Sequence, residues 1–163
     1  MKNILAIDPG NKRSAWLLYN PEVGRPIPDR FGIWDNEDLV RKLRRWHSGP
    51  IRKRPPPAVL VVETFRPRGQ PMYWQLIETA IWIGRFVEAW GGPFEYVTRS
   101  EAKHHVCGAT NVKDGNVRAA LIDRWGGKEK AVGLKKSPGP LHGISKDIWA
   151  ALAVAVTYAE RKC

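Results

Sequence analysis

Two apolar segments of the sequence each end on a carboxylate, and this pattern limits the folds that the chain can adopt. Residues 58–63, AVLVVE, are apolar and mostly β-branched up to Glu63. A continuous run of this kind is typical of a central strand that is covered on both faces of a sheet. Residues 2–8, KNILAID, form a similar pattern that ends at Asp8, where Pro9-Gly10 turns the chain. Two such strands predict an α/β protein.

The rest of the sequence alternates between strand and helix patterns. A hairpin partner for the first strand is expected over residues 13–19, and a long apolar helix over residues 72–90. The final helix, residues 145–160, is rich in alanine and carries Asp147 in its first turn. The other expected elements are strands at 30–34 and 94–97, helices at 36–47, 100–107 and 114–125, an extended connector at 49–57 and a long basic loop at 126–140. This order predicts a mixed central β-sheet flanked by α-helices, in one domain that spans residues 1–163.

Three acidic residues lie at the ends of these elements. If the two apolar strands are parallel neighbours, Asp8 and Glu63 emerge at one edge of the sheet, where α/β folds place their sites. Asp147 reaches this edge if the last helix packs with its N-terminus there. Converging carboxylates repel one another unless a cation lies between them, and hard oxygen ligands favour Mg²⁺ or Mn²⁺. Each acid alone also fits an ordinary place at a turn, a strand end or a helix start.

The charge of the chain indicates a polyanionic partner. The net charge is +11 and the pI is about 10.0, as is typical of proteins that bind nucleic acid. Residues 41–54, RKLRRWHSGPIRKR, contain seven Lys and Arg residues and no acid. With such a partner, the three carboxylates indicate phosphodiester hydrolysis assisted by two Mg²⁺ or Mn²⁺ ions. The alternative is a basic surface that only keeps the protein soluble.

Targeting signals are missing from the sequence. No apolar run approaches the length of a membrane span, and no signal-peptide pattern precedes Asp8. Cys107 and Cys163 form no CxxC pair and are too few for a disulfide scaffold. We therefore expect a reduced, cytoplasmic protein, and the basic, Trp-rich composition would suit a bacterial cell or a phage-infected host.

Five blocks of the sequence, in order, resemble the RuvC-type Holliday-junction resolvases, which have the RNase H-like fold. The blocks are ILAIDPGNKRSAWLLY, AVLVVETF, FEYVTRSEAKHHVCG, ATNVKDGNVRAAL and SKDIWAALAVAV, and they run over nearly the whole chain. The resemblance implies a metal-dependent endonuclease that resolves four-way DNA junctions by paired nicks and leaves 5′-phosphate ends.

The residues of the family's site carry over onto positions in these blocks. Asp8 and Glu63 match the first two metal-binding carboxylates, and Asp147 matches the acid before the Ala-Leu run of the last helix. Lys103 and Lys113 fall on basic positions that support cleavage and DNA contact in the family. The resemblance implies that they stabilise charge on the scissile phosphate, Lys113 nearer to the reaction. Either could instead be a positioning or merely solvated lysine.

One position departs from the family's pattern. Members often carry a further Asp or His three residues before the last acid, where this chain has Ile144, which cannot ligate a metal. His142 lies five residues before Asp147, and Gly143 could bring its ring round to the site. His142 is therefore expected as a fourth metal ligand or as the general base for water. The alternative is an ordinary loop histidine.

The loop after the second acid strand is expected to contact DNA. Phe65 stands next to Arg66 and Arg68, and a ring beside arginines suits stacking on unpaired bases. In the family an aromatic residue near this loop inserts at the junction, although Phe65 could instead pack beneath the loop. Four lysines complete the expected DNA contacts: Lys103, Lys113, Lys135 and Lys136.

The long helix is too apolar for a one-sided surface helix. One face is expected to meet the sheet: Leu76, Ile77, Ala80, Gly84 and Val87. A second stripe would then be exposed and form a dimer interface, unless other helices cover it: Trp82, Phe86 and Trp90. The resembling family dimerises through the equivalent helix, and a two-fold homodimer would present two active sites to a two-fold junction.

Other functions also fit parts of the sequence. A nuclease of the same fold could act on RNA:DNA hybrids or on branched DNA in general. A non-catalytic junction-binding module is supported only by Ile144, and the three intact acids oppose it. A nucleotide-binding protein of the actin-like fold would share the Asp-x-Gly turn, but its two lobes need a longer chain.

Overall fold

The computed structural model describes residues 3–48, 57–66, 69 and 71–162. Its main sheet has five strands in the order β3-β2-β1-β4-β5, in which β1, β4 and β5 are parallel and β2 and β3 are antiparallel to their neighbours. The strands are β1 (Ile4–Asp8), β2 (Arg13–Asn20), β3 (Arg25–Asp35), β4 (Val59–Thr64) and β5 (Phe94–Thr98). The mixed sheet flanked by helices that the sequence predicts is confirmed.

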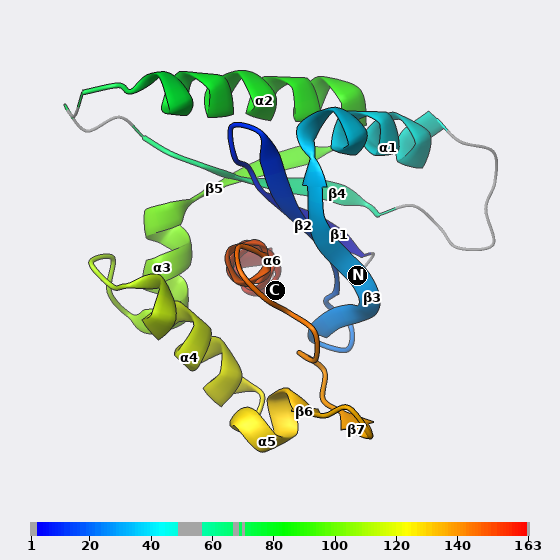
Figure 1. Ribbon diagram of the computed structural model, residues 1–163, viewed down its shortest axis with the longest axis vertical. Helices are drawn as coiled ribbons and strands as arrows, with labels where there is room; N and C mark the ends of the chain where they lie inside the picture. Colours follow the sequence, from blue (N-terminus) through cyan, green and yellow to red (C-terminus); the bar gives the residue numbers. More distant parts are fainter. Residues whose placement is uncertain (1–2, 49–56, 67–68, 70, 163) are drawn as a thin grey trace.

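Helices cover both faces of the sheet (Figure 1). α1 (Asn36–Ser48) and α2 (Trp74–Trp90) pack on one face, and α6 (Ile148–Lys162) packs on the other. α3 (Arg99–Cys107) and α4 (Asp114–Arg124) lie against α6, which is therefore enclosed between them and the sheet. Of the helices in the ranges given above, none is long and apolar enough to cross a membrane.

The two cores follow from the alternation of side chains along the strands. In β1, Ile4 and Ala6 belong to the core beneath α6, whereas Leu5 and Ile7 belong to the core beneath α1 and α2. All four side chains are buried. A strand that is apolar on both sides needs a helical layer on each side, which explains the central place of β1.

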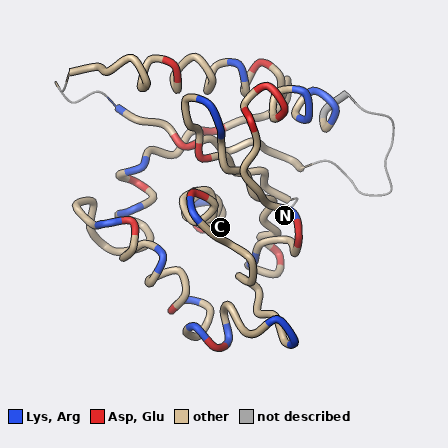
Figure 2. The backbone as a smooth tube through the Cα atoms, viewed as in Figure 1, with Lys and Arg blue, Asp and Glu red and all other residues tan. Residues whose placement is uncertain are grey.

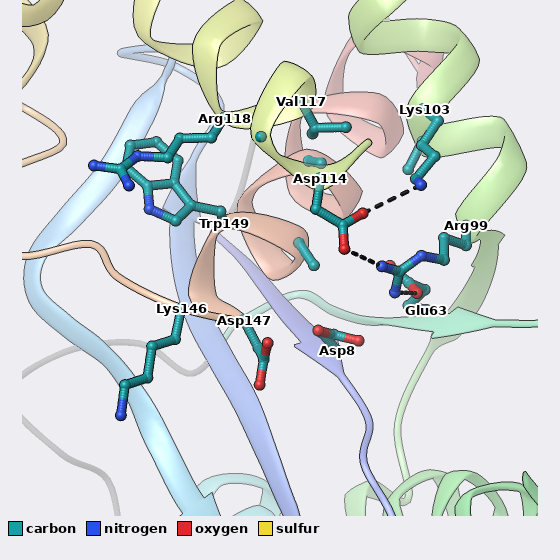
Figure 3. A pocket seen from close by; sticks show the side chains of 14 residues that line it. Asp8, Glu63, Arg99, Lys103, Asp114, Val117, Arg118, Lys146, Asp147 and Trp149 are labelled. Atoms are coloured by element: carbon teal, nitrogen blue, oxygen red, sulfur yellow. Dashed lines mark hydrogen bonds and ion pairs between the residues drawn. The ribbon is translucent and has the colours of Figure 1, made fainter. Parts of the chain in front are cut away.

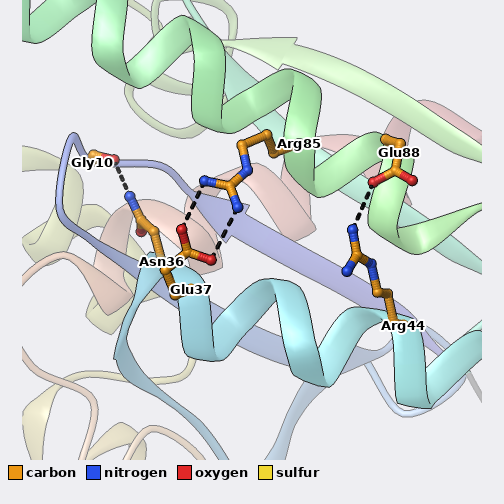
Figure 4. A network of polar contacts seen from close by, with 6 residues as sticks. All are labelled: Gly10, Asn36, Glu37, Arg44, Arg85 and Glu88. Carbon is orange, nitrogen blue, oxygen red and sulfur yellow. Dashed lines mark hydrogen bonds and ion pairs between the residues drawn. The ribbon is translucent and has the colours of Figure 1, made fainter.

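The turn after β1 is held by a buried polar pair. Ser14 donates its hydroxyl to the side-chain oxygen of Asn36 at 2.7 Å and accepts the backbone N–H of Gly10 at 3.1 Å. The Asn36 amide donates to the Gly10 carbonyl at 2.8 Å (Figure 4). A Cβ atom at Gly10 would lie 2.3 Å from the carbonyl oxygen of Arg13, so only glycine fits. These contacts fix the chain just where it leaves Asp8.

Ion pairs at the surface join α1 to α2. Arg85 contacts Glu37 through both guanidinium nitrogens, at 2.9 and 3.0 Å, and Arg44 contacts Glu88 at 3.3 Å (Figure 4). Because these side chains are largely solvated, the pairs orient the two helices and add little to stability.

The predicted exposed stripe of α2 is wrong for two of its three residues. Phe86 and Trp90 are buried against the sheet, with 0% and 1% of their surface exposed, and only Trp82 is partly exposed. Burial of these two rings removes more apolar area from water than burial of the small Ala80 and Gly84 would. Trp90 also donates its indole N–H to the Pro93 carbonyl at 2.9 Å.

The side of α2 predicted to meet the sheet is also partly wrong. Ala80 and Gly84 face solvent, and the buried residues of the helix are Ile83, Phe86, Ala89 and Trp90. The large apolar side chains that α2 and its N-terminal approach leave exposed are instead Met72, Tyr73, Trp74 and Ile81.

The segment predicted as one long loop at 126–140 contains regular structure. It forms the short helix α5 (Lys128–Ala131) and a hairpin of β6 (Gly133–Leu134) and β7 (Ser137–Pro138). The hairpin depends on Gly133, whose φ of 66° and close approach to the Ser137 carbonyl exclude a side chain. Sequence patterns miss such a short element because neither strand has room for an alternation.

Candidate active site

Strand register brings Asp8 and Glu63 to one edge of the sheet. Ile7 pairs with Val62 in the parallel ladder between β1 and β4, and one residue further along each strand come the two acids. Ile7 and Val62 point to the core beneath α1 and α2. Because side chains alternate along a strand, Asp8 and Glu63 lie on the opposite face, which packs against α6. The sheet thus brings together two of the three predicted carboxylates.

Asp147 reaches the same place from the N-terminal end of α6. Its carbonyl accepts the backbone N–H groups of Ala150 and Ala151, so Asp147 precedes the helix instead of lying in its first turn. The helix begins at Ile148, later than the sequence predicts, because Lys146 adopts a left-handed conformation with a φ of 49°.

The three carboxylates line one pocket of about 360 Å³. Figure 3 shows Asp8 between Glu63 and Asp147, where β1, β4 and the start of α6 meet. The pocket also has a basic lining, contributed mostly by α3 and α4: Arg99, Lys103, Arg118 and Lys146. The site therefore combines clustered acids with a positive rim.

The electrostatics of the acids favour a cation beside them. Burial, followed by the neighbouring Glu63 carboxylate, raises the pKa of Asp8 from 3.8 to about 8. Burial also raises the pKa of Glu63, and the charge of Arg99 opposes part of that rise. A positive charge that enters beside such a carboxylate stabilises its ionised form.

Arg99 and Asp114 are pocket residues that the sequence reasoning missed. Arg99 Nη1 lies 3.4 Å from Glu63 Oε1, and Arg99 Nη2 lies 2.7 Å from Asp114 Oδ2 (Figure 3). Lys103 Nζ lies 3.2 Å from Asp114 Oδ1 and donates to the Val112 carbonyl at 2.7 Å. Although burial works in the other direction, the Lys103 hydrogen bond and the Arg99 charge lower the pKa of Asp114.

A signal for Arg99 was present in the sequence. It directly follows β5, which is parallel to β4 and pairs Val97 with Glu63. Arg99 therefore starts at the same edge of the sheet as the acids. Asp114 is the first residue of α4, and its position beside the pocket depends on how α4 packs.

The carboxylates fit a hard divalent cation by their chemistry and charge. Asp8, Glu63 and Asp147 supply only oxygen donors, and Mg²⁺ and Mn²⁺ prefer such donors. Within the ranges that the structure describes, however, no three acidic, histidine or cysteine side chains are grouped closely enough to hold a metal ion as they stand. Glu63 is paired with Arg99 instead.

The other residues expected at the site lie at varying places. Lys103 lines the pocket, whereas Lys113 is exposed at the residue before α4 and is not part of the lining. His142 is also exposed and outside the lining, with its Nδ1 3.1 Å from the Val132 carbonyl. Its role as a ligand or base stays a prediction, as does the near-catalytic role of Lys113.

Among the expected DNA contacts that the structure describes, Lys103 alone lines the pocket. Phe65 is partly buried and packs against the core beneath α1 and α2, the alternative considered from the sequence. Arg66 is exposed, and Arg68 lies outside the described residues. Lys135 and Lys136 are exposed in the turn between β6 and β7. Contact with DNA stays a prediction for all of them.

Comparison with solved structures places the fold among known ones. A structure of RuvC from Thermus thermophilus matches with a TM-score of 0.57 and 16% sequence identity over 98% of this chain and 96% of that chain. The structure of T. thermophilus RuvC in complex with a Holliday junction substrate matches with a TM-score of 0.60 and 17% identity over 99% and 95%. No family model and no curated protein sequence matches the chain. The resemblance seen in the sequence is therefore confirmed in three dimensions: the chain has the RNase H-like fold of RuvC.

Proposed function

We propose that this protein is a metal-dependent, structure-specific endonuclease that resolves four-way DNA junctions by paired nicks. The observation that carries the proposal is the convergence of Asp8, Glu63 and Asp147 on one pocket with a basic rim. The fold adds support, since one matching structure is a RuvC bound to a Holliday junction. Such an activity would serve DNA recombination and repair in the cytoplasm of a bacterial or phage-infected cell.

The three carboxylates are the residues that would hold Mg²⁺ or Mn²⁺. Two such ions, when bound, activate water and stabilise the leaving oxygen in phosphodiester hydrolysis. Asp8 lies between the other two carboxylates (Figure 3), so it would be central to holding the ions. Hydrolysis with the water attacking phosphorus and the 3′ oxygen leaving gives 5′-phosphate ends.

The basic rim would bind and orient the DNA backbone. Lys103 is held toward the pocket by its contacts with Val112 and Asp114, so it can neutralise charge on a phosphate there without a large loss of side-chain freedom. Figure 2 shows further basic residues along α3 and α4, next to the acids at the sheet edge. Binding through phosphates predicts a strong loss of affinity as the salt concentration rises.

A homodimer would match the two-fold symmetry of the junction. On α2 the exposed apolar side chains Trp74 and Ile81 lie seven residues apart, on one side of the helix, with exposed fractions of 64% and 53%. A self-complementary contact through this side would bury them, and it replaces the stripe that the sequence suggested.

The proposal is tested by comparing substrates side by side. A synthetic four-way junction, a flap and an RNA:DNA hybrid are incubated with the protein in Mg²⁺ or in Mn²⁺, and the products are mapped on both strands. We expect symmetric nicks in the junction that a ligase seals directly, which requires 5′-phosphate ends. Preferred cleavage of the hybrid would favour the second candidate, a hybrid nuclease of the same fold. Binding of the junction without any cleavage would favour a non-catalytic module.

A further inference from the structure

We propose that Arg99 is a built-in counter-ion of the metal site, which pairs with Glu63 in the metal-free protein and shifts wholly to Asp114 when a divalent cation binds. This inference rests on the proposed function, because it concerns the same pocket. It assigns roles to two residues, Arg99 and Asp114, that neither the sequence motifs nor the fold comparison singles out.

The guanidinium bridges two carboxylates of very different surroundings. Glu63 has only 10% of its side chain exposed, whereas Asp114 has 70% exposed and Arg99 has 48%. A buried carboxylate without a positive partner is costly, so Glu63 needs Arg99 whenever no other cation is near. The solvated Asp114 does not need Arg99 in the same way.

The two contacts also differ in length. Arg99 Nη2 lies 2.7 Å from Asp114 Oδ2, a full charge-assisted hydrogen bond, whereas Arg99 Nη1 lies 3.4 Å from Glu63 Oε1, near the limit of one. The contact with Glu63 is therefore the one that a stronger cation can replace. Because separate nitrogens make the two contacts, Arg99 can leave Glu63 and keep Asp114.

Competition at Glu63 explains why the acids do not form a ready ligand set. A divalent ion among Asp8, Glu63 and Asp147 would take the oxygen that Arg99 now contacts and would repel the guanidinium. Asp114, which is also held by Lys103, lies ready to keep the displaced side chain at the pocket wall. Arg99 then presents free N–H groups to the region where a phosphate would enter, and it acts as a positioning residue.

The test measures metal binding by isothermal titration calorimetry with Mn²⁺ and the DNA-free protein. Arg99→Gln removes the competitor, and we expect it to tighten Mn²⁺ binding by about tenfold, the scale of one unit charge at contact distance that solvent screens strongly, as at the half-exposed Arg99. Asp114→Asn removes the alternative partner, holds Arg99 on Glu63 and should weaken binding by about threefold or more.

Lys103→Gln is the matched control. It removes the same charge from the same pocket, but Lys103 contacts Asp114 and not Glu63. We expect less than about a threefold change in Mn²⁺ affinity. If Arg99→Gln and Lys103→Gln tighten Mn²⁺ binding equally, the change reflects only the loss of a positive charge near the pocket, and the proposal is overturned. Unchanged or weaker binding by Arg99→Gln would overturn it as well.

The outcome separates this inference from the proposed function. Asp8→Asn reports whether the pocket binds Mn²⁺ at all, and circular dichroism on every variant reports whether it is folded. If Mn²⁺ binding depends on Asp8 but Arg99→Gln leaves it unchanged, only the role of Arg99 fails. If the folded wild-type protein and Asp8→Asn bind Mn²⁺ equally weakly, the pocket is not a metal site, and both the proposed function and the role of Arg99 are wrong.

Discussion

The two apolar helices α2 and α6 lie on opposite faces of the same sheet and are buried in very different ways. Ten consecutive or nearly consecutive residues of α6 are buried, because α3 and α4 enclose it from the side away from the sheet. On α2 only Ile83, Phe86, Ala89 and Trp90 are buried, and bulky side chains such as Trp74 face solvent.

The difference shows that apolar content alone does not tell which side of a helix is buried. α6 uses alanine along much of its length, which lets it fit tightly between three neighbours. α2 packs on one layer and turns only one side inward, where Phe86 and Trp90 are buried, while Trp74 stays exposed. The candidate site lies where the enclosed helix begins.

Phe86→Ala is expected to have the largest effect on stability. Its side chain is fully buried, and removal of a buried aromatic ring costs about 3–5 kcal/mol in the free energy of unfolding. Chemical denaturation at two protein concentrations measures it. The loss should be the same at both, because the ring belongs to the core of one chain. Ile81→Ala is the control on the exposed side of α2, and its cost in the monomer should stay below about 1 kcal/mol.

Ala151→Leu compares the packing of α6 directly with that of α2. Ala151 is completely buried, so added methyl groups should overpack the core and cost about 1–3 kcal/mol. The matched change on α2 is Ala80→Leu at an exposed position, which should change the free energy of unfolding by less than about 0.5 kcal/mol. Equal effects at the two positions would mean that α6 is not enclosed more tightly than α2.

The half of the molecule that contains α6 and Asp8 should also make stability depend on pH. Because the pKa of Asp8 is raised in the folded state to about 8, the protonated carboxyl stabilises the fold below pH 4, and this contribution is lost as the pH rises through about 8. In EDTA, the melting temperature of Asp8→Asn should therefore exceed that of the wild type by a margin that grows between pH 4 and pH 9. Differential scanning calorimetry measures the gap, and a gap that stays constant with pH would contradict the burial of a repelled charge.

Arg44→Ala should have the smallest effect on the free energy of unfolding. The Arg44–Glu88 pair lies at the surface between α1 and α2, so its removal is expected to cost at most about 0.5 kcal/mol and to matter less in high salt. Thermal unfolding at low and high salt checks this. A larger loss would mean that ion pairs, and not the buried rings of α2, hold this layer on the sheet.

Much of the fold was predictable because it depends on local patterns. The alternation and apolar runs of β1 and β4 specify two central strands, and their parallel pairing then places Asp8 and Glu63 together. The orientation of α2 was not predictable in this way, since both of its sides are apolar and only the packing decides between them. Asp114 was missed because its contact with Arg99 depends on how α3 and α4 pack, which no spacing in the sequence records.

The proposed function places metal-dependent cleavage of branched DNA in the pocket around Asp8. The most direct measurement compares Asp8→Asn with Asp123→Asn, a change of the same kind at an exposed acid outside the pocket, for both binding and cleavage of a four-way junction in Mg²⁺. We expect Asp8→Asn to bind the junction at least as well as the wild type and to cleave it more slowly by about a thousandfold or more. Asp123→Asn should bind and cleave the junction like the wild type. Undiminished cleavage by Asp8→Asn would contradict the proposed function.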